Sequence, residues 1–508
     1  MTDPTATADA HTAVQHPSSA PELVDVLIVG AGLSGIGAAY HLQARCPGKR
    51  FLLLEGRQAM GGTWDLFRYP GVRSDSDMHT LGYHFRPWRD AKVIADGPAI
   101  RAYIEDTAHE YDLVRHIRFG HRAIRASWSS VDARWLVEAV GPDGAQRQFS
   151  CAFLYMCSGY YDYAEGYLPQ WPGMADFQGT LVHPQHWPAD LDYAGKRVVV
   201  IGSGATAVTL VPELARTAAH VTMLQRSPTY IFSLPSVDAV AGTLYRWLPA
   251  RFAHSLIRWK NVLLMMYFYN LSRWRPEFMK RSLLRLVQRR LGPDFDVGKH
   301  FTPRYQPWDQ RLCFVPDADL FRTLRAGRAT VVTDEIETFT SRGLRLKSGE
   351  ILEADIIVTA TGLKVQLLGG MQVDIDGTPI DPATAMLYKG LMYRDIPNFA
   401  SAFGYTNASW TLKCDLTAEY VCRLLNHMDA RGYDFCAPHM SDTAITPEPA
   451  IGLTSGYVQR ARDTLPKQGS RRPWRLYQNY ALDLLTLKFG RVNDGTLKFG
   501  RVAKPKQQ

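Results

Sequence analysis

The chain alternates between short apolar runs and segments in which apolar residues recur with helical spacing. The run VDVLIV, at residues 24–29, precedes the glycine turn GAGLSG, a segment of helical spacing and the apolar run FLLLE. The same order returns over residues 197–226, which read RVVVIGSGATAVTLVPELARTAAHVTMLQR. Strand, tight turn, helix and strand in this order form a βαβ unit with parallel strands. The pattern therefore predicts an α/β fold with two nested dinucleotide-binding, Rossmann-like units.

Further elements are predicted between and after these two units. Residues 117–140 and 149–157 have the pattern of strands in a small β-meander, and residues 330–362 are β-patterned throughout. Helical spacing over residues 240–292 predicts a helical insertion. Near the C-terminus, the heptapeptide TLKFGRV occurs at 486–492 and again at 496–502, around the turn-forming sequence NDG. This local duplication predicts a β-hairpin without a chemical role.

Composition restricts the class of protein. A chain of 508 residues with 46% hydrophobic and 21% charged residues is long enough for two or three domains. The seven cysteines form no closely spaced pair, which argues against a zinc site or a secreted disulfide framework and favours a reducing cytoplasm. The N-terminal residues lack the basic and apolar blocks of a signal peptide, so we expect a disordered tail over residues 1–22.

The net charge of +9 is unevenly distributed, since residues 246–290 hold eleven Lys or Arg and a single acid, Glu277. No basic-aromatic motif of nucleic-acid binding accompanies them, so no nucleic-acid partner is expected. The apolar block VLLMMYFY, residues 262–269, is far shorter than the roughly 20 residues of a membrane-spanning helix. Oligomeric state has no signature in the sequence.

Two interpretations of this basic segment remain open. Its large apolar residues recur near helical spacing, which favours a stripe facing the core, with basic residues on the wet side. The alternative is an interfacial helix that gives the protein a peripheral contact with anionic membranes. The residues in this stripe are Trp247, Leu256, Trp259, Leu263, Met266 and Tyr267.

The first glycine turn has the sequence features of a dinucleotide site. Gly30, Gly32 and Gly35 form GxGxxG between a predicted strand and a predicted helix. These glycines permit the turn, the approach of a pyrophosphate and close helix packing, while the helix N-terminus attracts the phosphates. Glu55, at the end of FLLLE, is placed to accept hydrogen bonds from a ribose.

The second turn has Gly202, Gly204 and Ala207 in the same context. Its second strand ends in Gln225, Arg226 and Ser227, so no acid stands where it would repel a 2′-phosphate. Arg226 can pair with that phosphate, which favours NADP over NAD. Two such units indicate a resident flavin and a nicotinamide that exchange hydride. Because no cysteine pair lies near the first unit, dioxygen is the leading electron acceptor.

Two further motifs resemble the signatures of the Baeyer–Villiger monooxygenases. GGTWDLFRYPGVRSD, residues 61–75, is similar to the family's first signature at every fixed position. FQGTLVHPQHWP, residues 177–188, is similar to the second. The resemblance extends over about residues 24–440 and is strongest to the bacterial branch of ethionamide-activating monooxygenases. It implies that NADPH reduces FAD, that oxygen adds at flavin C4a, and that the resulting peroxyflavin converts ketones to esters or lactones and oxidises sulfides.

The resemblance also implies roles for individual residues. Arg311 is similar to the family's active-site arginine, which stabilises a developing anion, and Asp75 to the carboxylate that orients it. Many relatives carry a lysine just before this arginine, where this chain has Gln310. His183 is expected to set domain position rather than to act as a base, and no metal site is expected. The implied cofactor contacts are Gly30, Gly32, Ser34, Gly35, Glu55, Thr63, Trp64, Asp65, Leu66, Arg73, Ser74 and Asp75 to FAD, with Gly202, Ser203, Gly204, Ala205, Thr206, Ala207, Val208, Arg226 and Ser227 to NADPH.

These observations divide the chain into expected domains. The first part of the FAD-binding domain covers 23–165, a linker 166–190, and the NADP-binding domain with its helical insertion 191–355. The chain returns to the FAD-binding domain over 356–440 and ends in a C-terminal extension, 441–508.

Two rival functions are kept. One is a flavin monooxygenase restricted to N- or S-oxygenation, which should lack the Trp187–Pro188 end of the second signature. The other is a non-enzymatic flavoprotein redox sensor, which would show no ketone-dependent consumption of NADPH.

Overall fold

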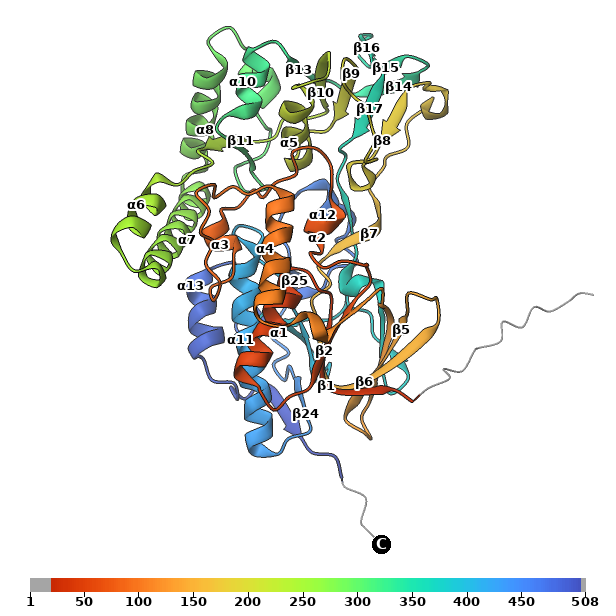
Figure 1. Ribbon diagram of the computed structural model, residues 1–508, viewed down its shortest axis with the longest axis vertical. Coiled ribbons are helices and arrows are strands. Elements are labelled where there is room, and N and C mark those ends of the chain that lie inside the picture. The colour runs from red at the N-terminus through yellow and green to blue at the C-terminus, as the bar shows by residue number, and fades with distance from the viewer. Residues whose placement is uncertain (1–19, 504–508) are drawn as a thin grey trace, which may run out of the picture.

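The computed structural model describes residues 20–503, so residues 1–19 of the expected tail lie outside the described residues. The first strand, β1 (Glu22–Val29), already begins at Glu22. Figure 1 shows two sheet-containing parts stacked one above the other, with the helical segment of residues 239–291 along one side. The predicted α/β class with two nested units is confirmed.

The first sheet has nine strands and contains both parallel and antiparallel pairs. β1 lies between β2 (Phe51–Glu55) and β6 (Gln146–Met156), parallel to both. The predicted meander is confirmed from Arg122 onward, where β4 (Arg122–Ser129), β5 (Arg134–Val140) and β6 are antiparallel, whereas residues 117–119 form a strand parallel to β2. It is not a separate sheet, because β6 joins it to the parallel strands. The sheet is completed by β3 (Ile117–Phe119), β19 (Gln372–Ile375), β20 (Thr378–Pro379) and β23 (Phe399–Ser401).

Helices cover this sheet because its central strands are apolar on both faces. Every residue of β2 is buried. The helices α1 (Leu33–Arg45) and α11 (Trp410–Arg431) pack against each other in the same core, together with residues of α4 (Gly97–Glu110). The N-terminus of α4 is capped by Asp96, whose side chain accepts a hydrogen bond from the Ala99 amide.

The second sheet is parallel throughout, in the order β13-β10-β9-β17-β8. β9 (Arg197–Ile201), β10 (His220–Gln225) and the helix α5 (Ala205–Leu214) form the predicted second unit. The edge strand β8 (Thr180–Val182) comes from the expected linker. The remaining strands of this sheet are β13 (Ala329–Thr333) and β17 (Ile356–Thr359), and a separate antiparallel sheet consists of β14 (Ile336–Thr340), β15 (Gly343–Leu346) and β16 (Ile351–Glu353).

The predicted helical insertion consists of α6 (Ala239–Trp247), α7 (Ala250–Trp274) and α8 (Pro276–Leu291). The expectation that its large apolar residues face the core is wrong. Trp247 is 77% exposed and Tyr267 60%, and Leu256, Trp259 and Leu263 are exposed as well. Met266, the remaining residue of the stripe, is partly buried and packs against Val262, Tyr405 and Leu412.

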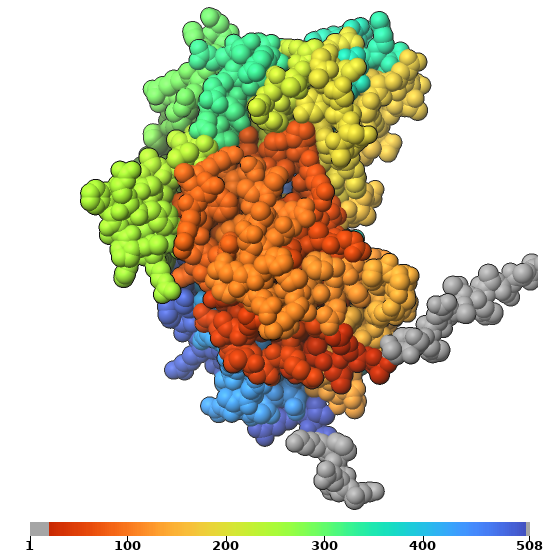
Figure 2. Space-filling view, viewed as in Figure 1, coloured from red at the N-terminus to blue at the C-terminus, as the bar shows by residue number. Residues whose placement is uncertain are grey.

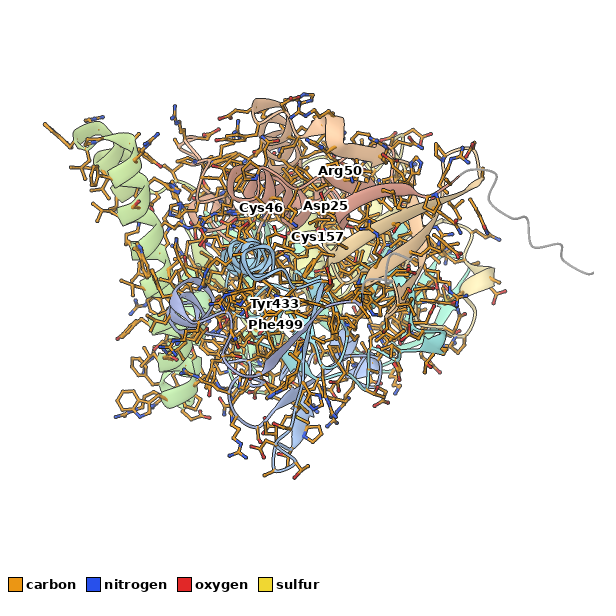
Figure 3. The ribbon with its side chains drawn as sticks, turned by 90° about the horizontal axis from the view of Figure 1, so that it is seen from below. Asp25, Cys46, Arg50, Cys157, Tyr433 and Phe499 are labelled. Carbon is orange, nitrogen blue, oxygen red and sulfur yellow. The ribbon has the colours of Figure 1, made fainter. Side chains whose placement is uncertain are left out.

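The predicted C-terminal hairpin is also wrong. The first copy of TLKFGRV lies mainly in a helical segment, Leu484–Phe489, and the second forms β27 (Leu497–Gly500). β27 pairs with β24 (Phe435–Pro438) instead of with the first copy. Phe499, from the second copy, stacks on Tyr433 with ring centroids 5.0 Å apart (Figure 3). The conformation of each copy is determined by the residues that it packs against in the fold, and these contacts outweigh the turn preference of NDG.

Short elements complete the fold. They are α2 (Thr63–Leu66), α3 (Met78–Leu81), α9 (Val297–Phe301), α10 (Asp319–Arg325), α12 (Gly456–Arg460), α13 (Tyr480–Asp483), β7 (Tyr161–Gly166), β11 (Ile231–Leu234), β12 (Cys313–Pro316), β18 (Leu363–Val365), β21 (Leu387–Tyr388), β22 (Met392–Tyr393), β25 (Pro447–Pro449) and β26 (Lys467–Gly469).

Candidate active site

The first glycine turn is fixed by contacts that only glycine allows. Gly30 has φ +106°, and its N–H donates to the Leu54 carbonyl over 2.7 Å. A Cβ on Gly30 would lie 2.5 Å from the carbonyl oxygen of Cys157, which Figure 3 places near the centre of the molecule. A Cβ on Gly35 would lie 1.9 Å from the Gly30 carbonyl oxygen, because α1 packs directly on the turn. The turn therefore ends at Gly32, where no side chain caps the first amides of α1. Those free amides and the helix dipole form an anion site that fits a pyrophosphate.

Glu55 is held beside this anion site by two backbone amides. One carboxylate oxygen accepts from Ala31 N over 2.8 Å and the other from Arg57 N over 2.9 Å. The residue is only 5% exposed, and burial raises the pKa of its carboxyl. Its position at the end of β2, next to the glycine turn, fits a ribose hydroxyl as a further donor.

The second glycine turn repeats this construction at the other sheet. Gly202 has φ +135°, its N–H donates to the Leu224 carbonyl over 2.8 Å, and a Cβ would lie 2.3 Å from the Ala360 carbonyl oxygen. Gly204 stands before α5 with no side-chain cap and with no atom within 4 Å of an added Cβ. The start of α5 can therefore also accept a phosphate.

The end of β10 lies beside this second turn. Ser203 Oγ donates to the Ser227 carbonyl over 3.1 Å, which ties the turn to the residues after the strand. Gln225 is buried and donates to the His300 carbonyl over 2.7 Å, whereas Arg226 and Ser227 are exposed. Arg226 is thus free to reach a ligand at the turn.

One cleft with a volume of about 680 Å³ joins the two units. Residues of the first unit and the start of α5 both line it. The first-signature loop closes one side, because Tyr69 and Gly71 pack on α5, where a Cβ on Gly71 would lie 3.0 Å from Glu213 Cβ. Burial raises the pKa of Tyr69 to about 12. The predicted site residues that line the cleft are Gly30, Gly32, Ser34, Glu55, Thr63, Trp64, Arg73, Ser74, Asp75, Ala205, Thr206 and Arg311.

An arginine–carboxylate pair stands in this cleft. Arg311, just before β12, donates from Nη2 to Asp75 Oδ1 over 2.9 Å, and its side chain is 37% exposed. The negative charge of Asp75 raises the pKa of Arg311, so the guanidinium stays protonated. Arg73 is held away from this pair by Asp319, over 2.6 Å. Arg311 is therefore an oriented cation of the cleft, and its exposed part can face a ligand.

Several predicted site residues do not line the cleft. Asp65, in α2, is buried among arginines, 2.7 Å from both Arg57 and Arg68 and 3.3 Å from Arg101, so it acts as the centre of a group of ion pairs. The second glycine turn and the end of β10 lie outside the cleft lining as well. The predicted residues in this group are Gly35, Asp65, Leu66, Gly202, Ser203, Gly204, Ala207, Val208, Arg226 and Ser227.

Sequence reasoning missed an aromatic wall beside Arg311. Tyr160 stacks on Trp410 with ring centroids 5.1 Å apart, and its hydroxyl lies 3.0 Å from that of Tyr161. Burial raises the pKa of Tyr161 to about 12, so the phenol stays neutral. The signal was present in CSGYY, which comes directly after β6. This strand lies beside β1, and ligands of parallel sheets bind at the carboxyl ends of such strands.

The second-signature stretch connects the two sheets. Its strand β8 pairs with β17 at the edge of the second sheet. The ring of His183 lies against Gly166 at the end of β7, where a Cβ would be 1.9 Å from the ring, and its Nδ1 accepts from the Gln185 amide over 3.2 Å. Burial lowers the pKa of His183. The histidine thus packs at a joint, outside the cleft lining.

Residues 20–503 contain neither a candidate metal site nor a helix that could span a membrane. No group of three or more His, Cys, Asp or Glu side chains there is arranged to hold a metal ion. No helix in the same range is long and apolar enough to cross a membrane.

Comparison with known proteins agrees with this architecture. Residues 28–91 match the family described as NAD(P)-binding Rossmann-like domain, and residues 93–264 the one described as flavin-binding monooxygenase-like. Among solved structures, an oxidised steroid monooxygenase bound to NADP superposes with a TM-score of 0.75 at 22% identity, over 94% of this chain and 100% of the other. OTEMO in complex with FAD and NADP superposes with a TM-score of 0.71 at 20% identity, over 95% and 100%. These two establish the shared fold.

Curated relatives are much closer in sequence. FAD-containing monooxygenase EthA of Mycobacterium tuberculosis (strain ATCC 25618 / H37Rv) is 54% identical over 485 residues, covering 95% of this chain and 99% of the relative. Probable FAD-binding monooxygenase AlmA of Acinetobacter baylyi is 49% identical over 480 residues, covering 94% and 96%. Two dinucleotide-binding units that share one cleft, with these relatives, define a flavin-dependent monooxygenase that uses FAD and NADP. The chain belongs to the family of FAD-containing monooxygenases that includes EthA, MymA and AlmA.

Proposed function

We propose that this enzyme inserts one oxygen atom of O₂ into ketones, giving esters or lactones, with FAD as resident cofactor and NADPH as electron donor. We propose sulfides as a second class of substrate. The Arg311–Asp75 pair, inside the cleft that both nucleotide units share, is the observation that carries the proposal. The names of two structural neighbours, cyclohexanone monooxygenase and steroid monooxygenase, support it through the substrates they denote.

FAD, once reduced, supplies the oxygen activation, and the chain positions the reactants. The amides at the start of α1 and the Glu55 carboxylate would hold the FAD pyrophosphate and ribose, and Thr63 and Trp64 would contact the flavin. The start of α5, with Arg226 and Ser227, binds NADPH. This division assigns each glycine turn one cofactor.

Arg311 acts on the substrate. As oxygen attacks the ketone, negative charge develops on the carbonyl oxygen, and a preorganised guanidinium stabilises that charge. Asp75 holds the guanidinium in place through the 2.9 Å hydrogen bond. The aromatic wall of Tyr160, Tyr161 and Trp410 keeps water from the reacting atoms.

The test is the Arg311→Ala variant. It should retain FAD and be reduced by NADPH, while ester formation from a panel of aliphatic, cyclic and aryl ketones falls by about 100-fold or more, the usual effect of removing a preorganised donor. Arg325→Ala, at an exposed position in the last turn of α10, is the matched control and should leave the rate unchanged. Retained ester formation in Arg311→Ala would remove Arg311 from its role.

The wild-type enzyme distinguishes the rival function. If it yields sulfoxides or N-oxides but no ester from any ketone of the panel, the protein is a monooxygenase restricted to N- or S-oxygenation. Trp187, which packs in the core of the second unit next to Tyr193, favours the ketone reaction because it completes the second signature.

A further inference from the structure

Several large apolar residues of the helix α7 face solvent, whereas those of a core helix would be buried. Phe252, Leu256, Trp259, Leu263 and Tyr267 are all exposed, and their spacing of three or four residues places them on one face. We call these five residues the α7 outer face. Trp274, the last residue of α7, and Trp247, the last residue of α6, are exposed as well. Figure 2 shows this green segment projecting from the side of the molecule.

The opposite face of α7 explains this orientation. Arg258 is buried there, donates to the carbonyls of His79 and Gly82 over 2.8 Å each, and lies 3.6 Å from Asp415 of α11. His254 is buried beside it. A buried guanidinium needs these partners, so the polar contacts of α7 face the protein and fix the apolar residues outward. The contacts of Arg258 and His254 on the inner side of α7 therefore keep the outer face exposed.

The segment that contains α7 is rich in basic residues. Of the eleven Lys and Arg between 246 and 290, Arg258, Lys260 and Arg273 pair with acids, and Lys280 is half-buried. Among the ion pairs of residues 20–503, none involves the exposed arginines of this segment other than Arg273. Arg275 stacks instead on the exposed Trp274, with its guanidinium 4.6 Å from the ring centroid. The unpaired arginines are Arg246, Arg251, Arg275, Arg281, Arg285, Arg289 and Arg290.

We propose that the α7 outer face docks on the surface of an anionic lipid membrane. An exposed helix with aromatic and aliphatic residues on one side, in a segment with many unpaired arginines, has the composition of an interfacial helix. Trp and Tyr are the residues that settle at the headgroup level. Anionic headgroups supply the negative charge that the unpaired arginines lack.

Charge decides between a membrane and a second copy of the chain. Two copies that met through this face would bring their unpaired arginines together, with Glu277 the only acid that the segment offers between 246 and 290. Like charges at an interface oppose association, whereas an anionic bilayer attracts every one of these arginines. The membrane is therefore the occupant that the charges select.

Vesicle sedimentation with the full-length, FAD-loaded enzyme tests this proposal. The enzyme should pellet with vesicles that contain phosphatidylglycerol and stay in the supernatant with vesicles of phosphatidylcholine alone. Raising the salt to 1 M, which shortens the Debye length to about 3 Å, should weaken the electrostatic part of the binding. Equal binding to both vesicle types, or to neither, would overturn the proposal.

Two variants separate the apolar and charged contributions. Leu256→Ser/Leu263→Ser should lose most vesicle binding, because both side chains are exposed and belong to the face. Arg246→Gln/Arg251→Gln/Arg275→Gln should weaken binding about tenfold or more, since each basic residue near an anionic surface contributes on the order of a fivefold change. Val131→Ser/Ile351→Ser, at two exposed apolar positions elsewhere, is the matched control and should bind like the wild type.

Flavin absorbance and monooxygenase activity in solution should be unchanged in all these variants, which shows that they are folded. Wild-type vesicle binding in Leu256→Ser/Leu263→Ser would overturn the proposal. If that variant instead converts a dimer to a monomer with vesicle binding intact, the face is an interface between copies and not a membrane surface.

Discussion

The two glycine turns of this protein use the same backbone device in two sheets. In each, a glycine with positive φ ends the first strand and donates its N–H to the neighbouring strand. In each, the carbonyl of an adjacent strand end, Cys157 or Ala360, stands where a side chain would be. The helix that follows each turn has an uncapped N-terminus, which can bind a phosphate. The shared part of the construction therefore selects a dinucleotide in general.

The two turns differ in the helix and the strand that come after them. At the first, α1 packs so closely that only Gly35 fits, and the buried Glu55 ends the next strand. At the second, the corresponding helix position is Ala207, and the next strand ends at the buried Gln225, which the exposed Arg226 follows. In the proposed assignment, the end of the second strand, rather than the turn, distinguishes the FAD site from the NADPH site.

Gly30→Ala should have the largest effect, because it strains the backbone and places a methyl group 2.5 Å from the Cys157 oxygen. Strain in this φ region alone costs about 1–3 kcal/mol. We expect loss of bound FAD and a lower melting temperature, measured by flavin absorbance and calorimetry. Gly48→Ala, where an added Cβ meets nothing within 4 Å, is the control. A stable, flavin-loaded Gly30→Ala enzyme would contradict the assignment.

Gly202→Ala should break only the second site. The added methyl would lie 2.3 Å from the Ala360 oxygen, so the turn must shift away from its phosphate position. We expect the purified variant to keep FAD while NADPH no longer reduces it in stopped-flow absorbance. Reduction by dithionite should still occur, which separates loss of NADPH binding from damage to the flavin. Normal reduction by NADPH would show that the second turn does not bind the nicotinamide cofactor.

Arg226→Ala should change the choice of nicotinamide. Loss of a charge-assisted hydrogen bond of about 1.5–3 kcal/mol corresponds to a ten- to hundredfold rise in KM for NADPH. The KM for NADH, which has no 2′-phosphate, should stay the same. Arg325→Ala serves again as the control. Equal effects on both nucleotides would mean that Arg226 does not recognise the 2′-phosphate.

Glu55→Gln should have the smallest effect of the series. The amide keeps an oxygen for one backbone donor, but it loses the charge that strengthens a hydrogen bond to ribose. We expect FAD to dissociate more readily, by roughly fivefold, measured by fluorescence of released flavin. Unchanged retention would place the ribose contact elsewhere.

The parts of the fold that were predicted correctly are determined by residues close together in the sequence. Both βαβ units, the meander and the helical insertion follow from periodicity and turn chemistry, which act over a few residues. The exposure of the α7 outer face was not predicted. Periodicity shows which residues share one face of a helix, but not whether that face packs on the protein or lies in solvent. The partner that turns Arg258 inward, Asp415, lies far along the chain, in α11.

The same limit applies to the candidate site. The glycines, Glu55 and the Arg311–Asp75 pair were found through motifs, but Tyr160 and Trp410 become neighbours only when α11 closes on the first sheet. The two TLKFGRV copies make the point within one sequence, since identical residues are mainly helical in one copy and partly a strand in the other.

The loop that contains the first signature, residues 61–75, makes the two nucleotide-binding units depend on each other. Leu66, Phe67, Tyr69 and Val72 belong to the chain of the first unit but are buried with α5 in the core of the second. A fragment that ended at the linker would expose these residues to water and leave α5 without its cover. The two nucleotide-binding units therefore cannot be exchanged independently between related proteins. A chimera that takes its second unit from a relative would also need residues 66–72 from that relative.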